Sequence, residues 1–189
     1  MNPLQTKFIA WTRPAEGGLV DDPNDPGRIT KFGISLRFLE SLGELGDIDG
    51  DGDVDADDVR ALTHKISDEL IIKHFWERCR CDDMPPRLAF CVGDMAVNGG
   101  PKRAGRILQT TIRNHGIKVA VDGAIGPNTL KAAGQLFSHM GGTLPAYYQG
   151  GRAHYYHSIT IANSKLAKFT QGWFNRLFLL DAHICEVLN

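Results

Sequence analysis

The chain has 189 residues, enough for one well-cored domain or two small ones, and its 42% hydrophobic and 23% charged residues are ordinary for a soluble globular protein. No apolar stretch approaches the length of a membrane span, which argues against an integral membrane protein. The formal net charge of −1 hides a division: residues 1–98 carry 11 Lys and Arg against 19 Asp and Glu, whereas residues 99–189 carry 10 against 3.

Helical patterns alternate with one loop-rich segment in the first part of the chain. Residues 17–33 are dense in Gly, Pro and Asp and predict a loop or a small hairpin. Ser67 is predicted to be the N-cap of the helix that follows it, with two acidic residues in the first turn. Helices are expected over residues 3–13, 35–42, 57–65 and 67–79.

The second part of the chain predicts a series of helices. An apolar helix is closed by Asn98-Gly99-Gly100, and a tight polar turn (VAVDGAIG) separates two amphipathic helices. These patterns predict a mostly helical protein, in which an acidic lobe over residues 1–98 and a basic lobe over residues 99–189 form one compact unit. The expected helices cover residues 88–97, 101–115, 127–139, 143–161 and 171–188.

The most specific local signal is the acidic run from Asp47 to Asp58 (DIDGDGDVDADD). Carboxylates fall at positions one, three, five, nine and twelve of a calcium-loop pattern, with glycine at position six and an apolar residue at position eight. Aspartates at this density repel one another unless a cation lies among them. The alternative is a solvated acidic linker. We predict an EF-hand-like site for a structural Ca²⁺ with the ligands Asp47, Asp49, Asp51, Asp53 and Asp58.

Neither the cysteines nor the histidines form a zinc-binding pattern. The four cysteines lack C-x-x-C spacing and predict reduced thiols, two or three of them buried, in a protein that folds in a reducing compartment. The seven histidines show no H-x-x-x-H or H-x-x-E-H spacing. Zinc amidase or peptidase chemistry is therefore not expected.

Glu16 begins a segment with the residue types that glycosidic bond cleavage needs. That reaction requires a proton for the leaving oxygen and a carboxylate on the opposite face of the sugar. Apolar neighbours such as Trp11 and Phe32 would raise the pKa of Glu16, as an acid requires. Asp25, in a polar loop, would stay ionised, and the Thr30 hydroxyl can hold the water. Any glutamate beside two glycines would satisfy this pattern, so a loop-capping role for Glu16 stays open.

The run from Glu16 to Ser35 (EGGLVDDPNDPGRITKFGIS) resembles the signature of glycoside hydrolase family 108, whose members are N-acetylmuramidases found among phage endolysins and related bacterial lysins. The run DMAVNGG, which begins at Asp94, resembles the central helix of that family. The pair LQ at residues 108–109 and the run VDGAIGPNTL at residues 121–130 resemble the peptidoglycan-binding region that usually follows. With G-W-x-x-R near the end, the resemblance covers roughly residues 8–180.

This resemblance implies a lysozyme-like helical fold with an inserted calcium loop, and it matches Glu16 to the catalytic glutamate of the family. Asp25 and Thr30 follow at spacings similar to the Glu, Asp and Thr set of phage-type lysozymes. The implied reaction is hydrolysis of the β-1,4 bond between N-acetylmuramic acid and N-acetylglucosamine. We expect an inverting mechanism with Glu16 as the acid and Asp25 orienting the water. A lytic transglycosylase and a non-catalytic, calcium-dependent wall-binding module remain alternatives.

Other polar residues are candidate substrate contacts. Asp94 and Asn98 share one helix face and can line a glycan cleft, although Asn98 can equally cap its helix. Gln109 can bind sugar or be a buried amide that is hydrogen-bonded to backbone. Asp122 is expected to order its turn. Aromatic side chains stack on sugar rings or pack at the edge of a core, and four tyrosines are open to both interpretations: Tyr147, Tyr148, Tyr155 and Tyr156.

The basic second half favours a polyanionic partner such as nucleic acid, anionic lipid or a bacterial wall polymer. Under the resemblance this partner is the peptidoglycan glycan strand. Lys and Arg are scattered without a recognition motif, so nucleic-acid binding is not expected, nor is stable membrane insertion, and a monomer is the default. The N-terminal run lacks the features of a signal peptide. We therefore expect accumulation in the host cytoplasm and release to the cell wall through a holin-type pore, as the endolysin resemblance implies.

Overall fold

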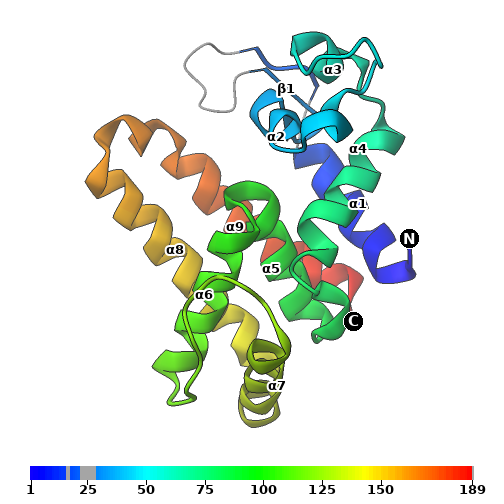
Figure 1. Ribbon diagram of the computed structural model, residues 1–189. Coiled ribbons are helices and arrows are strands. Elements are labelled where there is room, and N and C mark those ends of the chain that lie inside the picture. The colour runs from blue at the N-terminus through cyan, green and yellow to red at the C-terminus, as the bar shows by residue number, and fades with distance from the viewer. Residues whose placement is uncertain (16–17, 22–28, 189) are drawn as a thin grey trace. The chain divides into compact units, whose positions relative to one another are not determined.

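The computed structural model describes residues 1–15, 18–21 and 29–188. Helices dominate these residues, with one small antiparallel hairpin, as the sequence predicts (Figure 1). The chain divides into two compact units, Met1–His74 and Phe75–Asn189. The predicted lobes divide at a different residue, and that division stays a prediction.

The first unit is built from short elements, and its hairpin confirms the predicted one. In the hairpin, Thr30 pairs with Ser35 and Lys31 pairs with Ile34. The turn between them uses left-handed backbone at Phe32 (φ 51°) and Gly33 (φ 80°), where only glycine is free of steric cost. The elements are α1 (Pro3–Ala15), β1 (Thr30–Lys31), β2 (Ile34–Ser35), α2 (Leu36–Glu40), η1 (Gly43–Gly46), α3 (Ala56–Ala61) and α4 (His64–Ile71).

The helix boundaries around residue 63 differ from the prediction. The expected helix over residues 57–65 is interrupted, because Leu62 (ψ 130°) and Thr63 (ψ 161°) leave the helical region between α3 and α4. The N-cap of α4 is Thr63, whose hydroxyl accepts a hydrogen bond from the backbone N–H of Ile66 at 3.3 Å. Ser67 is therefore not a cap: it lies inside α4 and is buried. A cap is defined by the hydroxyl that captures a free N–H, and Thr63 does so one turn earlier.

After α4 the chain continues through a π-helical turn, η2 (Ile72–Glu77), into the second unit. The predicted helices of this unit are confirmed, each within two residues of its expected limits. Among the described residues, none of the helices has the length and apolarity that crossing a bilayer requires. The elements are η3 (Cys81–Asp83), α5 (Pro86–Gly99), α6 (Pro101–Asn114), α7 (Pro127–Met140), η4 (Gly141–Thr143), α8 (Leu144–Ala162), η5 (Ser164–Phe169) and α9 (Thr170–Val187).

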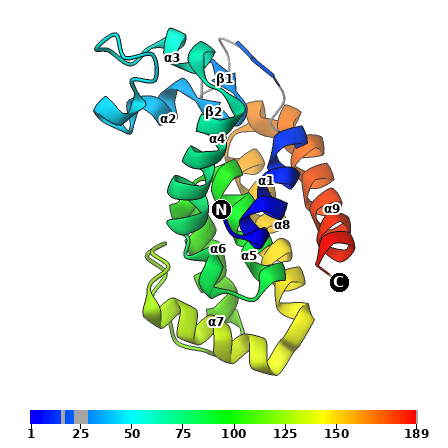
Figure 2. The ribbon, with the colours of Figure 1, turned by 90° about the vertical axis from the view of Figure 1, so that its right-hand side faces the viewer.

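Helix α5 is the centre of the second unit. Every residue from Leu88 to Ala96 is buried, and α5 packs against α6, α8 and α9 (Figure 2). The indole N–H of buried Trp76 donates to Asp82 at 2.9 Å, and its ring meets Phe90 edge to face at 6.1 Å. A helix that is apolar on nearly all sides needs partners on nearly all sides, which α6, α8 and α9 provide.

The cysteines agree with the prediction of reduced thiols. Cys79, Cys81 and Cys91 are buried and free, whereas Cys185 is exposed and free. Burial raises the pKa of the Cys79 thiol and of the Cys91 thiol to about 12. These thiols are therefore protonated and act as small apolar core residues.

Candidate active site and metal site

Thr30 is the described member of the predicted catalytic set, since Glu16 and Asp25 lie outside the described residues. Thr30 is the first residue of β1 and is half-buried. Its backbone N–H donates to the carbonyl of Val20 and its carbonyl accepts from the Val20 N–H, both at 2.8 Å. The main chain at Thr30 is therefore held in an antiparallel bridge.

The end of α1 is held by an ion pair that the sequence analysis did not predict. Arg13, in the last turn of α1, forms an ion pair with Asp68 of α4, and its Nε donates to Asp68 Oδ1 at 3.3 Å. Asp68 is buried, whereas Arg13 is half exposed. The two residues are 55 positions apart, so no local pattern links them. Arg13 is three residues before Glu16, so this contact fixes the helix that leads to the predicted acid.

Phe32, which was expected near Glu16, has a described partner of its own. Its ring stacks on the imidazole of His64, with the centroids 4.0 Å apart. The ammonium of Lys31 lies 5.2 Å from the Phe32 centroid and donates to the carbonyl of Arg60. These contacts connect the hairpin to the start of α4 and the end of α3.

The acidic run folds into a loop whose carboxylates accept hydrogen bonds from the loop backbone. Asp47 accepts from the N–H groups of Gly50 (2.6 Å) and Gly52 (3.0 Å). Asp58 accepts from Ile48 (2.5 Å) and Asp55 (2.6 Å). Gly50 and Gly52 have φ of 80° and 103°, so the loop turns where glycine allows left-handed backbone.

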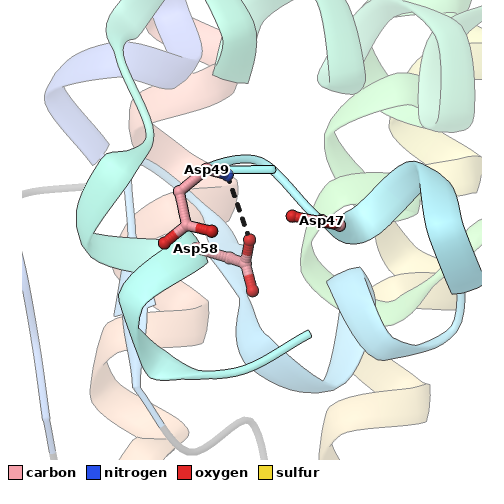
Figure 3. A group of neighbouring side chains, drawn as sticks. All are labelled: Asp47, Asp49 and Asp58. Carbon is pink, nitrogen blue, oxygen red and sulfur yellow. Dashed lines mark hydrogen bonds between the residues drawn. The ribbon is translucent and has the colours of Figure 1, made fainter. Parts of the chain in front are cut away.

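Two groups of carboxylates in this loop have the spacing of a cation site. The ligand atoms of Asp47, Asp49 and Asp58, drawn in Figure 3, lie within 4.8 Å of one another. The ligand atoms of Asp53, Asp55 and Asp58 do so as well. Asp58 belongs to both groups and is only 1% exposed. Of the five predicted ligands, Asp47 and Asp49 lie in the first group, Asp53 lies in the second, Asp58 is shared, and Asp51 is in neither. Asp55, which was not predicted as a ligand, belongs to the second group.

Electrostatics within the loop favour a cation. The negative charge of Asp51, followed by desolvation, raises the pKa of Asp53, and desolvation followed by the charge of Asp51 raises the pKa of Asp49. Burial of Asp58 acts in the same direction, but the backbone N–H groups of Asp55, Ile48 and Asp49 outweigh it and lower the pKa of Asp58. Asp58 is therefore ionised inside the loop. A set made only of carboxylate oxygens suits a hard divalent cation, so these residues fit the group that the sequence predicts.

Asp94 and Asn98 share one face of α5, and that face turns toward α8 and α9. The carboxylate of Asp94 is fully buried and accepts from Arg152 Nη2 at 2.6 Å and from Arg176 Nε at 2.9 Å. The side-chain oxygen of Asn98 accepts from the Tyr156 hydroxyl at 2.8 Å, and Gly100, not Asn98, is the C-cap residue of α5. Their described partners are thus internal, and their role in substrate binding stays a prediction.

Arg152 is a structural residue that the sequence analysis missed. It lies in the tyrosine-rich part of α8, is fully buried, and donates to Gln149 (2.8 Å) and Tyr156 (3.3 Å) as well as to Asp94. Burial opposes its charge, but Asp94 and Tyr156 hold the pKa of Arg152 above its ordinary value. The Tyr156 ring in turn stacks on Trp173 of α9, with centroids 4.9 Å apart. The signal in the sequence was a single arginine among the tyrosines of α8.

Gln109 of α6 is the buried amide that was one of its two predicted interpretations. Its Nε2 donates to Asp122 (2.8 Å) and to the carbonyl of Ala124 (3.0 Å), and its Oε1 accepts from the Gly123 N–H (2.8 Å). Asp122 also accepts from the Ala124 N–H at 2.8 Å, and so orders its turn as predicted. Gln109 thus fixes the turn before α7. A sugar contact by Gln109 stays a prediction.

Comparisons with known proteins agree with this arrangement. Residues 9–100 match the family described as Glycosyl hydrolase 108, and residues 103–178 match the family described as Predicted Peptidoglycan domain. The structure of Brucella abortus SagA is similar, with a TM-score of 0.76 and 26% sequence identity over 96% of this chain and 94% of that chain. A comparison with curated protein sequences finds no match. The chain thus carries a glycosyl hydrolase 108 domain followed by a predicted peptidoglycan domain, and it is a glycosidase.

Proposed function

We propose that the protein is an N-acetylmuramidase, which hydrolyses the β-1,4 bond between N-acetylmuramic acid and N-acetylglucosamine in peptidoglycan. One observation carries the proposal: the glycosyl hydrolase 108 match over residues 9–100 contains Glu16, Asp25 and Thr30 in order and is followed by the peptidoglycan match over residues 103–178. This bond is a glycosidic bond, as the first match implies, and it lies in peptidoglycan, as the second match implies.

Each residue of the proposed catalytic set has a distinct role. Glu16 protonates the oxygen of the leaving sugar, Asp25 activates a water on the opposite face, and the Thr30 hydroxyl holds that water. The backbone bridge at Thr30 supports the proposal, because the residue that holds the water must itself be held at a fixed position.

The test is product analysis with purified peptidoglycan. Glu16→Gln should lower the rate by roughly 10²–10⁴, the usual contribution of a general acid. Glu44→Gln, which changes an exposed glutamate in η1, is the matched control and should keep the wild-type rate. Mass spectrometry of the products should show the addition of water at each cut. Anhydro-muramyl ends would instead indicate a lytic transglycosylase. If Glu16→Gln and Glu44→Gln cleave peptidoglycan at the same rate, Glu16 is not the acid.

The proposed mechanism is inverting. An activated water must fit between the two carboxyl groups, which requires a separation of about 6.5–9.5 Å, whereas a covalent route requires about 5–5.5 Å. Nuclear magnetic resonance of the first-formed sugar reports its anomeric configuration. Retention of the configuration would contradict the role of Asp25 as the residue that activates water.

We propose that the divalent cation of the acidic loop is Ca²⁺. The two groups of carboxylates that share Asp58 offer only oxygen ligands, and the loop between α2 and α3 turns at glycines as calcium loops do. The ion would neutralise the repulsion among the aspartates and fix the connection between these helices. Calorimetric titration of chelated protein with Ca²⁺ and with Mg²⁺ tests the identity of the ion.

We propose a lytic role for the protein, with accumulation in the host cytoplasm before it reaches the wall. Expression in the cytoplasm of a bacterium should leave the cells intact, whereas expression with an added export signal or together with a membrane pore should lyse them. Lysis from the cytoplasm without either addition would contradict this route.

A further inference from the structure

The four tyrosines of α8 separate into two pairs with different surroundings. Tyr148 and Tyr156 are 0% and 1% exposed and belong to the core. Tyr147 is 53% exposed, and Tyr155 is half-buried. The core interpretation therefore applies to Tyr148 and Tyr156, and the sugar-stacking interpretation stays a prediction for Tyr147 and Tyr155. In the outer pair, the Tyr147 ring meets the His115 imidazole edge to face at 4.6 Å, and the Tyr155 ring lies 5.7 Å from that of Tyr156.

Tyr147 and Tyr155 line a groove between α6 and α8 with a volume of about 490 Å³. This volume is in the range of about 300–1,000 Å³ that is usual for small-molecule sites. The wall on the side of α6 includes Arg103 and Arg106, and the floor on the side of α8 includes Gly150 and Gly151. All residues of the groove lie in the second unit and within the peptidoglycan match.

The two glycines that line the groove have different surroundings. A Cβ at Gly151 would lie 3.0 Å from Ile107 of α6, so this glycine allows the two helices to approach. A Cβ at Gly150 would meet no described atom within 4 Å. Gly150 is therefore not required for packing in the described structure, and its lack of a side chain leaves the groove unfilled.

The groove is cationic. Arg103 lies over the Tyr155 ring, with its guanidinium carbon 4.4 Å from the ring centroid, and Arg106 is exposed. None of the described residues that line the groove carries a carboxylate. Arginine held against an aromatic ring is ordered and weakly hydrated, which favours recognition of a carboxylate.

We infer that this groove binds an acidic muramyl peptide, with a sugar ring against Tyr147 and a peptide carboxylate against Arg103 and Arg106. In peptidoglycan, the peptide carboxylates are attached next to the sugar, and the groove presents aromatic and cationic groups side by side in the same way. The inference rests on the proposed action on peptidoglycan. It names two arginines of the basic half, Arg103 and Arg106, that would contact the wall polymer. It extends that proposal, since the groove contains none of the predicted catalytic residues.

The test measures binding of a soluble disaccharide-tetrapeptide to the full chain in a Glu16→Gln background, which limits cleavage of the probe. Gly150→Trp fills the groove, and Gly134→Trp is its control, because Gly134 is an exposed glycine of α7 whose added Cβ also meets no described atom within 4 Å. Arg106→Glu is paired with Arg113→Glu, which makes the same charge change on α6 outside the groove.

Gly150→Trp and Arg106→Glu should each weaken binding at least about tenfold, which is 1.4 kcal/mol, while both controls stay within about twofold of the parent. The uncharged sugar chitotetraose, which lacks the peptide carboxylate, should bind more weakly than the muropeptide, and Arg106→Glu should not change its binding. Equal losses in a variant and its control would overturn the inference, as would binding of a short DNA duplex in place of the muropeptide. Thermal unfolding measures whether each variant is folded. If Gly150→Trp does not fold, Arg106→Glu and its control still test the groove.

Failure of the groove and failure of the proposed function give different results. If wild-type protein cleaves peptidoglycan but muropeptide binding does not depend on Gly150 or Arg106, only the groove inference is wrong. If binding depends on both residues but wild-type protein releases no sugar fragments, only the proposed hydrolysis is wrong.

Discussion

Replacement of Asp94 by asparagine tests the buried network of the second unit. The Asp94 carboxylate is 0% exposed and accepts hydrogen bonds from Arg152 on one oxygen and from Arg176 on the other. Asparagine keeps the shape of the side chain but removes its charge and places an NH₂ donor against one of the guanidinium groups. Arg152 would then be a buried cation without a counterion.

The expected cost follows from the burial of both partners. Removing one member of a buried ion pair typically costs about 3–5 kcal/mol, because the other charge stays in a medium of low polarity. Arg152 is 0% exposed, and its Nε already has no partner among the described residues, so the side chain has little access to water. For a chain of 189 residues this corresponds to a fall in melting temperature of roughly 6–20 °C.

Urea unfolding followed by far-ultraviolet circular dichroism measures this cost. The control is Asp83→Asn, which breaks the exposed ion pair with Arg80 and should cost at most about 1 kcal/mol. The double variant Asp94→Asn/Arg152→Met removes both charges and should lose less stability than the two single variants together. A cost for Asp94→Asn equal to that of Asp83→Asn would refute the assignment of a buried, charged network.

Three further predictions concern stability. Gly105→Ala should destabilise the protein by about 1–3 kcal/mol in chemical unfolding, because its Cβ would lie 2.2 Å from the Gly123 carbonyl oxygen, whereas Gly134→Ala should be neutral or stabilising by about 0.4–1 kcal/mol. Calcium at about 100 times its dissociation constant should add about 2.7 kcal/mol, so chelation should lower the melting temperature of the wild type and have little effect on Asp58→Asn. Thr63→Ala should cost about 1 kcal/mol through loss of the α4 cap, a larger loss than for an exposed helical threonine such as Thr110.

The helices of the second unit could be predicted from the sequence because their signals are local. Apolar periodicity marks the buried face of α6, and Pro101 and Pro127 begin helices where a missing N–H costs nothing. The start of α4 was less predictable because Thr63 and Ser67 both resemble caps. The choice between them depends on which hydroxyl meets a free N–H, and burial of Ser67 settles it.

The candidate functional residues were predictable only where their signal is local in the sequence. The acidic loop was predictable because all its carboxylates lie within one short run, and the structure groups four of them around Asp58: Asp47, Asp49, Asp53 and Asp55. The network around Asp94 was not predictable in this way, since its arginine partners are 58 and 82 residues away. The polar pair Asp94 and Asn98 on one helix face predicts a polar group opposite that face. The pair does not tell whether this group belongs to a ligand or to another part of the protein.

Helix α5 relates the two family matches to the packing of the chain. By sequence it belongs to the glycosyl hydrolase match, which ends at residue 100, but by packing it belongs to the compact unit that begins at Phe75. Its buried face is covered by α6, α8 and α9, and its only buried carboxylate is neutralised by arginines of α8 and α9. The C-terminal residues therefore complete the core around a helix of the catalytic match. The peptidoglycan match is thus part of the same folded unit as α5 and not a separable attachment.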